Sequence, residues 1–246
     1  MDCKLRFFPE TAAGGFSHID GTVAFYSRIN ALLQPDMTVL DFGAGRGRGA
    51  QEDPVPYRRQ LQVFQGKCQR VIGVDVDPAV AEHPALDEYH VLGDDSAVPL
   101  ADASVDLIVS DSTFEHIENP AQVAPELHRV LKPGGWLCVR TPNLWGYIGV
   151  GANVVPNRWH VAVLKRLQPH RKAVDVFPTR YRVNTRRAVR RYFPVSLWEH
   201  HMYGHFAEPA YFANSRIMWG AMLLLYRLTP RVCAPTWMIF LRKREV

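Results

Sequence analysis

The sequence predicts an α/β protein whose mostly parallel sheet is covered by helices on both faces. Between residues 35 and 142, strand-length apolar runs alternate with amphipathic segments, which is typical of strand-helix-strand units with parallel strands. The run Val39–Phe42 also opens into three glycines spaced two apart, so a buried strand can turn tightly into a helix. With 246 residues and 47% hydrophobic content, the chain can bury one core, or one core plus a lid, without disulfides or metals.

The elements of the amino-terminal half follow from these patterns. Phe16–Leu33 has apolar residues at helical spacing and is expected to form an amphipathic helix that either packs over the ligand site or caps the sheet. The first strand is expected at Val39–Phe42. The segment Arg48–Arg70 contains Pro54 and Pro56 and is expected to be a helix with a looped insertion. Three further apolar runs that end in carboxylates predict strands: Arg70–Asp75, Tyr89–Asp95 and Val105–Asp111.

The carboxyl-terminal half is expected to complete the sheet after a long irregular segment. A helix over Ala121–Leu131 begins after Asn119 and is stopped by Lys132–Gly135, and the fifth strand follows at Trp136–Thr141. From residue 142 to about 182 the pattern is irregular, holds most of the basic block and has the position of a lid. The remaining expected elements are a helix, a strand, a helix and a strand: Thr185–Phe193, Val195–Tyr203, Pro209–Leu228 and Trp237–Arg244.

Cysteine usage and hydropathy bear on the compartment of the protein. The four cysteines lie far apart and form no Cys-x-x-Cys pair, so neither a disulfide framework nor a metal site is predicted, and a reducing cytoplasm is indicated. Met1–Phe8 carries charges and lacks the apolar core of a signal peptide. The longest apolar run, Ile217–Tyr226, spans ten residues, short of the roughly 20 needed to cross a bilayer. A cytoplasmic protein is expected, with peripheral membrane contact left open.

Charge is segregated along the chain although the formal net charge is only +5. Residues 1–156 hold 12 basic and 20 acidic residues, residues 157–191 hold 11 and 1, and residues 192–246 hold 6 and 3. The basic block is either a solvated face or a surface for an anionic substrate, phospholipid headgroups or nucleic acid. Aromatic residues occur in the predicted lid: Trp145, Tyr147, Trp159, Phe177 and Tyr181. They are expected to form either the lid's own core, a pocket for a sugar or ring, a stacking groove for nucleic acid, or an interfacial membrane surface.

Carboxylates end four consecutive predicted strands: Asp41, Asp75, Asp94 and Asp111. The carboxyl ends of parallel strands meet at one edge of a sheet, where ligands of α/β proteins bind. Because like charges repel, a donor-rich ligand explains this arrangement better than stability does. A turn or helix cap remains the alternative for Asp75 and Asp94 taken singly. Asp41 directly precedes the glycine turn, so it would repel a pyrophosphate and favours a ligand with an ammonium group.

Four motifs occur in one order along this region: Asp41–Gly47, Val105–Ser110, Phe114–Ile117 and Leu131–Gly135. In this combination, residues 35–143 resemble the class I S-adenosylmethionine-dependent methyltransferases, in the group that contains the methyltransferase type 11 enzymes. The resemblance implies a Rossmann-like, doubly wound, mostly parallel seven-stranded sheet with an antiparallel edge strand and a lid insertion. The 34 residues from Asp41 to Asp75 exceed the roughly 20 of compact nucleotide folds, and the Arg48–Arg70 insertion accounts for the excess.

The resemblance implies S-adenosyl-L-methionine as the cofactor and S-adenosyl-L-homocysteine as the product. The implied contacts follow the strand ends: Asp41, Gly43 and Gly45 at the methionine end, Asp75 at the ribose hydroxyls, Asp94 with the backbone of Asp95 at adenine, and Ser110 and Asp111 near the methionyl part, with Ala44 and Val76 as further cofactor-binding residues.

Histidines supply the candidate catalytic groups. Methyl transfer from a sulfonium is a displacement, so alignment of the reacting atoms supplies most of the catalysis and a base is optional. For a hydroxyl acceptor the candidate base is His116, with Glu115 beside it, unless both merely hold the following loop. His200, His201 and His205 form a second cluster. Adjacent strand residues face opposite sides, so substrate contact or surface exposure is favoured there over metal binding.

These inferences converge on one methyltransferase domain over residues 1–246. It is divided into a cap helix in 1–34, a cofactor-binding core over 35–142, a basic lid and acceptor insertion over 143–191, and a strand-helix-strand over 192–246. The expected acceptor is an oxygen of a small, lipid-linked or glycan-linked molecule, whose anionic group would meet the basic block. The alternatives are a nucleic-acid methyltransferase and a non-catalytic cofactor-binding partner subunit. Against the first, the sequence has no Asn/Asp-Pro-Pro-Tyr motif and no recognisable RNA-binding module.

Overall fold

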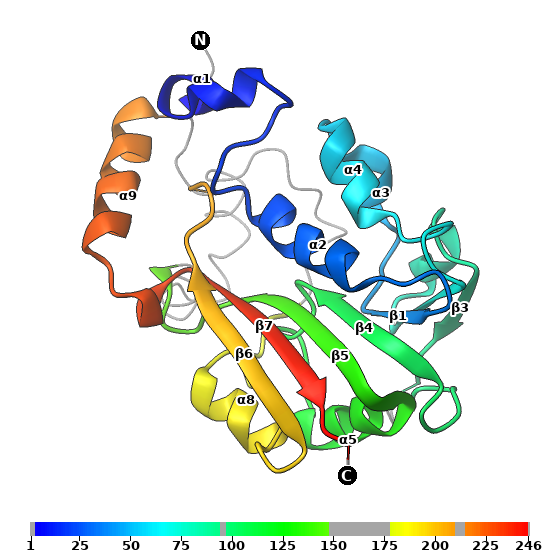
Figure 1. Cartoon of the computed structure of the whole chain (residues 1–246). Coiled ribbons are helices and arrows are strands. Elements are labelled where there is room, and N and C mark those ends of the chain that lie inside the picture. The colour runs from blue at the N-terminus through cyan, green and yellow to red at the C-terminus, as the bar shows by residue number, and fades with distance from the viewer. Residues whose placement is uncertain (1–2, 94–96, 148–177, 210–214, 246) are drawn as a thin grey trace.

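The computed structural model describes residues 3–93, 97–147, 178–209 and 215–245, which form one seven-stranded sheet with helices on both faces (Figure 1). The strands are β1 Thr38–Phe42, β2 Arg70–Asp75, β3 Glu88–Val91, β4 Val105–Asp111, β5 Leu131–Pro142, β6 Trp198–His205 and β7 Thr236–Lys243. They lie in the order β3-β2-β1-β4-β5-β7-β6. The predicted α/β fold class with a mostly parallel sheet is confirmed.

The strand pairing brings several strand ends to one side of the sheet. β1 pairs in parallel with β2 and β4, β2 with β3, and β4 with β5, whereas β7 runs antiparallel to both β5 and β6. The antiparallel strand therefore lies one place inside the edge, because β7 inserts between β5 and β6. The carboxyl ends of the parallel strands form what we call the carboxyl edge. Thr236, the first residue of β7, pairs there with Pro142 and His205.

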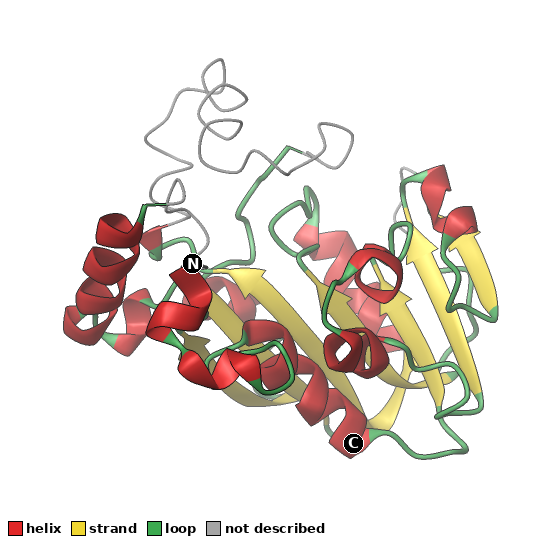
Figure 2. Ribbon diagram, turned by 90° about the horizontal axis from the view of Figure 1, so that it is seen from above, coloured by secondary structure: helices red, strands yellow, loops and turns green. Residues whose placement is uncertain are grey.

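Helices cover the two faces of the sheet with separate buried clusters. The helices are α1 Cys3–Phe7, α2 Gly21–Leu32, α3 Arg48–Glu52, α4 Pro56–Gln62, α5 Pro120–Val130, α8 Arg186–Tyr192 and α9 Arg216–Leu228, with short 3-10 turns at Pro9–Ala12, Pro78–Glu82 and Arg231–Cys233. On one face α5 and α8 bury Leu127 and Val189 against the strands. On the other face α2 and α4 bury Ile29 and Leu61. Figure 2 shows helices on both sides of the strands.

The helix predicted over Phe16–Leu33 is shorter than expected. It begins at Gly21, because the Asp20 carboxylate accepts hydrogen bonds from the backbone N–H groups of Thr22 and Val23 at 2.9 and 3.0 Å. A side chain that satisfies these first N–H groups fixes the start of a helix. The apolar residues before Asp20 belong to an irregular segment instead.

Two further expectations concern breaks in regular structure. The segment Arg48–Arg70 contains α3 and α4, separated around Pro54, as a helix with a looped insertion requires. The stop predicted at Lys132–Gly135 takes a different form, since α5 runs directly into β5. The four residues lie inside the strand, where the pairing with β4 shifts register. They form a bulge because Gly134 adopts a φ of +77°, which glycine tolerates.

Much of the predicted lid, residues 143–191, lies outside the described residues, and Trp159 and Phe177 lie there too. The described parts are residues 143–147 after β5 and residues 178–191 leading through α8. The division of the chain into a cap, a core, a lid and a terminal unit stays a prediction. Within the described ranges, no helix combines the length and the apolar composition needed to cross a membrane.

Candidate active site

The turn after β1 contains three glycines with positive φ: Gly43, Gly45 and Gly47. The N–H groups of Gly43 and Ala44 donate to the carbonyl of Val74 at 2.8 and 3.2 Å, which ties the turn to β2. A Cβ on Gly43, where φ is +80°, would lie 2.1 Å from Thr113 Oγ1. At Gly45, where φ is +53°, a Cβ would meet nothing nearer than Asp75 Oδ2 at 4.0 Å. Gly43 is therefore required by the protein's own packing, whereas Gly45 faces open space suited to a ligand.

Asp41 is a half-buried carboxylate beside this turn. Within the described part of the chain it accepts no hydrogen bond and forms no ion pair. Burial, followed by the nearby carboxylates of Asp111 and Asp75, raises the pKa of Asp41 to about 7. A carboxylate in this state is stabilised by an incoming cation. The predicted contact between Asp41 and the ammonium group of a ligand fits this environment.

Asp75, at the end of β2, anchors two backbone segments. Its Oδ2 accepts from the N–H of Gly45 at 2.8 Å, and its Oδ1 accepts from the N–H of Asp77 at 2.8 Å. Each carboxylate oxygen still has accepting capacity for a hydroxyl. The next side chain, Val76, is 63% exposed and offers an apolar surface beside Asp75. The predicted adenine contacts Asp94 and Asp95 lie outside the described residues.

Ser110 and Asp111, predicted near the methionyl part of the cofactor, make contacts within the protein. Ser110 is fully buried, and its hydroxyl donates to the carbonyl of Phe42 at 2.9 Å. The carboxylate of Asp111 accepts from Arg140 Nε at 2.7 Å and from Arg140 Nη2 at 2.5 Å, and the Tyr26 hydroxyl donates to it at 3.1 Å. Asp111 thus has a cationic partner in the chain, in contrast to Asp41.

Arg140 is a site residue that the sequence patterns did not single out. Its Nη1 donates to Thr22 Oγ1 at 3.0 Å, and its guanidinium lies 5.6 and 5.8 Å from the ring centres of Phe25 and Tyr26. Burial alone would lower the pKa of Arg140, but the Asp111 carboxylate outweighs this effect and raises it. The one signal in the sequence is a charged residue inside the otherwise apolar strand Trp136–Thr141.

A hollow of about 170 Å³ lies at the carboxyl edge beside the Asp111–Arg140 pair. Its lining comes from α2, the ends of β4, β5 and β6 and the start of β7: Gly21, Ser112, Arg140, Thr141, Pro142, His205, Ala207, Thr236 and Met238. Asp111 connects this hollow electrostatically with Asp41 and the glycine turn. The hollow therefore lies beside Asp111, one of the residues predicted to contact the cofactor.

His205 supplies a proton acceptor to the lining of this hollow. Its Nε2 lies 3.2 Å from the carbonyl oxygen of Ile19, and a carbonyl only accepts, so Nε2 carries the proton and Nδ1 of the neutral ring keeps its lone pair. Burial lowers the pKa of His205, with the Arg140 charge acting in the same direction. The ring is therefore neutral near pH 7. The sequence grouped His205 with His200 and His201, for which substrate contact or surface exposure was favoured over metal binding, and did not single it out as a base.

His116 and Glu115 form a structural contact with the segment before α8. Glu115 is 5% exposed and accepts from the Thr141 hydroxyl at 2.9 Å, and burial raises its pKa. His116 Nδ1 donates to the carbonyl of Pro178 at 3.0 Å. The backbone carbonyl of Glu115 accepts from the N–H groups of Arg180 and Tyr181. Neither side chain lines the hollow, so this geometry favours the alternative in which both hold the following loop.

The other two histidines of the cluster lie on opposite faces of β6. His200 Nε2 donates to the carbonyl of Phe193 at 2.8 Å, and His201 packs beside Trp136 with ring centres 5.6 Å apart. Among the described residues, no group of three or more His, Cys, Asp or Glu side chains could hold a metal ion.

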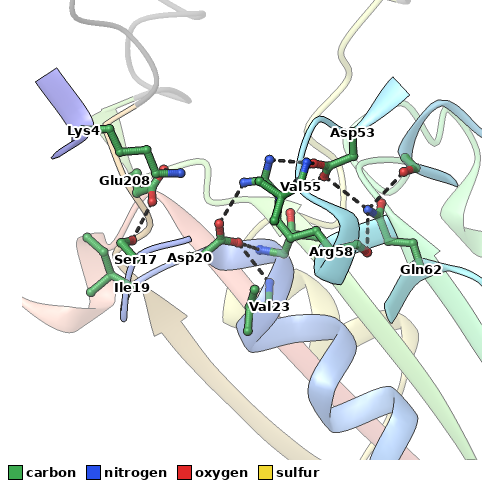
Figure 3. Close-up of polar contacts among 12 residues, drawn as sticks. Lys4, Ser17, Ile19, Asp20, Val23, Asp53, Val55, Arg58, Gln62 and Glu208 are labelled. Carbon is green, nitrogen blue, oxygen red and sulfur yellow. Dashed lines mark hydrogen bonds and ion pairs between the residues drawn. The ribbon is translucent and has the colours of Figure 1, made fainter. Parts of the chain in front are cut away.

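The amino-terminal segment, residues 4–20, contacts both the residues that follow β6 and helix α4 (Figure 3). Lys4 Nζ and Ser17 Oγ contact the carboxylate of Glu208, just after β6, at 2.9 and 2.5 Å. Farther along, Asp20 Oδ2 accepts from Arg58 Nη1 of α4 at 2.9 Å, and Arg58 also pairs with Asp53. The segment is thereby fixed between Glu208, just after β6, and Arg58 of α4.

Comparison with known proteins covers mainly the cofactor-binding region. Residues 40–139 match the family model described as "Methyltransferase domain". A Mycolicibacterium smegmatis protein named "Probable S-adenosylmethionine-dependent methyltransferase" is 38% identical over 110 residues, which cover 43% of this chain and 38% of that protein. Malonyl-(acyl-carrier protein) O-methyltransferase 1 of Coxiella burnetii is 33% identical over 114 residues, which cover 46% of this chain and 36% of that protein. The match thus spans less than two fifths of either relative.

The fold agrees with these sequence matches. A solved structure of a SAM-dependent methyltransferase from Thermotoga maritima has a TM-score of 0.55 at 15% identity, covering 98% of this chain and 99% of that chain. Residues 40–139 therefore form a class I S-adenosylmethionine-dependent methyltransferase domain, as the motifs predict. S-adenosylmethionine is the cofactor that this family and fold imply. Three features fit this cofactor. Asp41, which lacks a cationic partner among the described residues, suits the ammonium group. The open face of Gly45 allows a ligand to approach the backbone closely, and the exposed Val76 suits the adenine ring.

Proposed function

We propose that the chain transfers the methyl group of S-adenosylmethionine to an oxygen of an acceptor bound in the hollow beside Asp111 and Arg140. The observation that carries the proposal is the Asp41 carboxylate, which comes just before the glycine turn, with a pKa raised to about 7 and no cationic partner among the described residues. The methionine ammonium would supply that cation. Asp75 would hold the ribose hydroxyls, and Val76 would pack beside the adenine.

The residues around the hollow position the acceptor for an in-line displacement. S-adenosylmethionine supplies an electrophilic methyl group on a sulfonium. The chain's main task is then to align the attacking oxygen, which accounts for most of the rate gain in such reactions. An attacking hydroxyl also loses its proton. His205 Nδ1, in the lining of the hollow, is the candidate acceptor of that proton, and His116 stays the candidate from sequence.

An anionic, lipid-linked or glycan-linked acceptor is supported by the basic residues near α8. Arg182, Arg187 and Arg191 line a surface hollow of about 470 Å³. Among the described residues, no carboxylate forms an ion pair with any of these three arginines. Uncompensated arginines are suited to bind phosphate or carboxylate groups. The name of the Coxiella relative, an O-methyltransferase, supports oxygen as the methylated atom. The same arginines also suit nucleic acid, which remains the second candidate.

Calorimetric titration with S-adenosylmethionine and S-adenosylhomocysteine tests the first step of this proposal. Both ligands are expected to bind one site per chain, and a protein that binds neither contradicts the proposal. The acceptor is then sought with methyl-labelled cofactor against cell extract divided into lipid, glycan, small-molecule and RNA fractions. Label in the lipid or glycan fraction supports the proposed acceptor class. Label confined to RNA establishes the second candidate instead.

The base is tested by comparing His205→Gln with its matched control His116→Gln. We expect His205→Gln to lower kcat about 100-fold and to remove the acidic limb of the kcat pH profile, because Gln cannot take up the acceptor proton. The Kd for S-adenosylmethionine should stay unchanged. His116→Gln should stay within about threefold of the parent. If the two variants exchange these effects, the base is His116, and if neither lowers kcat, alignment alone drives the reaction.

A further inference from the structure

Helix α9 belongs to an excursion that leaves and re-enters the sheet at the carboxyl edge. β6 ends at His205, which pairs with Thr236 at the start of β7. The intervening residues 206–235 contain α9, which lies at the left of Figures 1 and 2, on the outside of the molecule. His205, Ala207 and Thr236 flank the two ends of this excursion and also line the acceptor hollow. Both ends of the segment that contains α9 therefore lie at the proposed active site.

The inward face of α9 is fixed by aromatic packing. Trp219 is 3% exposed, and its ring centre lies 6.3 and 6.4 Å from those of Phe7 and Phe8 in the amino-terminal segment. About two turns farther on, Tyr226 packs beside Phe206 with ring centres 5.1 Å apart. These contacts orient the helix about its axis, so the composition of its outward face is a fixed property of the surface.

The outward face of α9 is apolar. Ile217, Leu224 and Leu228 are 85%, 59% and 75% exposed, and Ala221 is exposed between them. Spacings of four, three and four residues place these four side chains on one stripe of the helix. Met218 and Leu225 widen the stripe on one side. Such a continuous apolar surface on a soluble fold marks a site of interaction.

The charged residues of the chain segment that contains this stripe all have one sign. Between Pro209 and Arg244 the sequence contains no Asp or Glu. Arg216 and Arg227 are exposed residues of α9, and helical spacing sets both about a quarter turn from the stripe on the same side. Arg231 is exposed just beyond the helix. An apolar stripe bordered by cations alone is the arrangement of helices that lie at the surface of anionic membranes.

We propose that α9 lies in the interfacial plane of an anionic lipid bilayer, with Ile217, Leu224 and Leu228 among the acyl chains. Its 13 residues correspond to about 20 Å of helix, short of the roughly 30 Å hydrocarbon core, so the helix lies along the surface and does not cross it. A symmetric contact with a second copy would set each Arg227 near the partner's basic residues with no acidic residue of this stretch to neutralise them. Anionic headgroups neutralise these arginines.

Resting on the proposed function, this orientation makes the acceptor a lipid-linked molecule. The excursion that carries α9 ends at the lining of the hollow, so binding through α9 brings the hollow close to the headgroup layer. An acceptor anchored in that layer is then presented to the site without leaving the membrane. Membrane binding and cofactor binding involve different residues, so each can fail without the other.

The test is flotation of the full chain with vesicles of phosphatidylcholine, alone or with about one third phosphatidylglycerol. We expect the parent to float with the anionic vesicles and to be released at high salt, because headgroup attraction is screened. The variant I217S/L228S should bind at least about tenfold more weakly. A control double variant, Y89S/V195S, replaces two exposed hydrophobic side chains (50% and 57%) outside α9 and should bind like the parent.

Each outcome decides the proposal. Loss of vesicle binding in I217S/L228S alone, with the Kd for S-adenosylmethionine unchanged by calorimetry, supports it. A parent that stays out of the anionic vesicle fraction overturns it, and so does equal binding by I217S/L228S and the parent. A concentration-dependent dimer in light scattering that I217S/L228S abolishes assigns the stripe to a second copy and also overturns it. Absent cofactor binding with intact vesicle binding contradicts the proposed function alone.

Discussion

The two halves of the carboxyl edge carry the same residue type in opposite electrostatic states. Asp41 ends β1 and Asp111 ends the neighbouring strand β4. Asp41 has no cationic partner in the described chain, whereas Asp111 forms two hydrogen bonds with Arg140 and one with Tyr26. The β1–β2 half is thus electrostatically incomplete, and the β4–β5 half is already neutralised.

This difference distinguishes a carboxylate that lacks a cationic partner among the described residues from one whose charge is balanced within the protein. The repulsion among strand-end carboxylates, which from sequence indicates a donor-rich ligand, is relieved in two ways. At Asp111 the relief comes from β5, through Arg140. At Asp41, where Asp111 and Asp75 only increase the repulsion, the proposed source of relief is the methionine ammonium. The carboxylates therefore have distinct roles despite their equivalent positions.

Removing the protein's own cation should have the largest effect. Arg140→Met leaves the partly buried Asp111 carboxylate without its ion-pair partner and close to Asp41. We expect a loss of about 3 kcal/mol in the free energy of unfolding at pH 8, because an uncompensated buried charge is strongly destabilising. Urea unfolding measures this loss. The double variant R140M/D111N should recover most of this lost stability. A loss below about 1 kcal/mol for R140M would show that Asp111, like Asp41, does not depend on a cationic partner in the protein.

Asp41→Asn should act on the other half with the opposite sign on stability. The folded-state pKa of Asp41 is about 7 and the unfolded value is about 4, so ionisation destabilises the folded state and this cost develops as pH rises between those values. The Asn variant avoids it and should be more stable at pH 8 by on the order of 1–2 kcal/mol. Its affinity for S-adenosylmethionine should fall about 30-fold.

The pH dependence of cofactor binding gives a second measure of the same residue. In the parent, calorimetric affinity for S-adenosylmethionine should rise from pH 5.5 to about pH 7, because the ammonium binds the ionised form of Asp41. In Asp41→Asn this rise should be absent. A variant that is destabilised, or that keeps the rise, contradicts the role given to Asp41.

The smallest effect is expected at the glycine turn and is isolated by a matched pair. Gly45 and Gly66 both have positive φ values, +53° and +77°, and a Cβ at either meets nothing closer than 4.0 Å. Alanine at each should cost about 1 kcal/mol of stability through backbone strain. Gly45→Ala should also weaken S-adenosylmethionine binding about tenfold, whereas Gly66→Ala should leave it unchanged. Equal affinities of the Gly45→Ala and Gly66→Ala variants for S-adenosylmethionine would mean that the cofactor does not approach Gly45.

Much of the fold follows from the sequence because its signals are local. The runs Arg70–Asp75 and Val105–Asp111 become strands with the predicted bounds, since apolar β-branched residues between turn signals have few other stable states. The start of α2 was predicted too early. The apolar spacing begins before Asp20, whereas the helix itself begins only after the Asp20 cap. The bulge at Lys132–Gly135 resembles a turn in sequence, and only its pairing with β4 shows it to be part of a strand.

The acceptor side was less predictable because its features depend on contacts between distant segments. Arg140 and Asp111 are 29 residues apart, and His205 and Ile19 are 186 apart. No motif connects such pairs. The outward face of α9 has the same difficulty, because its sequence is apolar on both sides and only the packing of Trp219 shows which side is buried. His116 illustrates the converse, since its place after β4 suggested chemistry where the structure has a loop contact.

The return of residues 206–235 to the strand pair that they left has an evolutionary consequence. His205 and Thr236 occupy paired positions in β6 and β7, so the intervening cassette begins and ends at one rung of the sheet. Recombination that exchanges residues 206–235 preserves the order of all seven strands in the sheet. Exchange of this single segment therefore leaves unchanged both the strand order and residues 40–139, which match the methyltransferase family model.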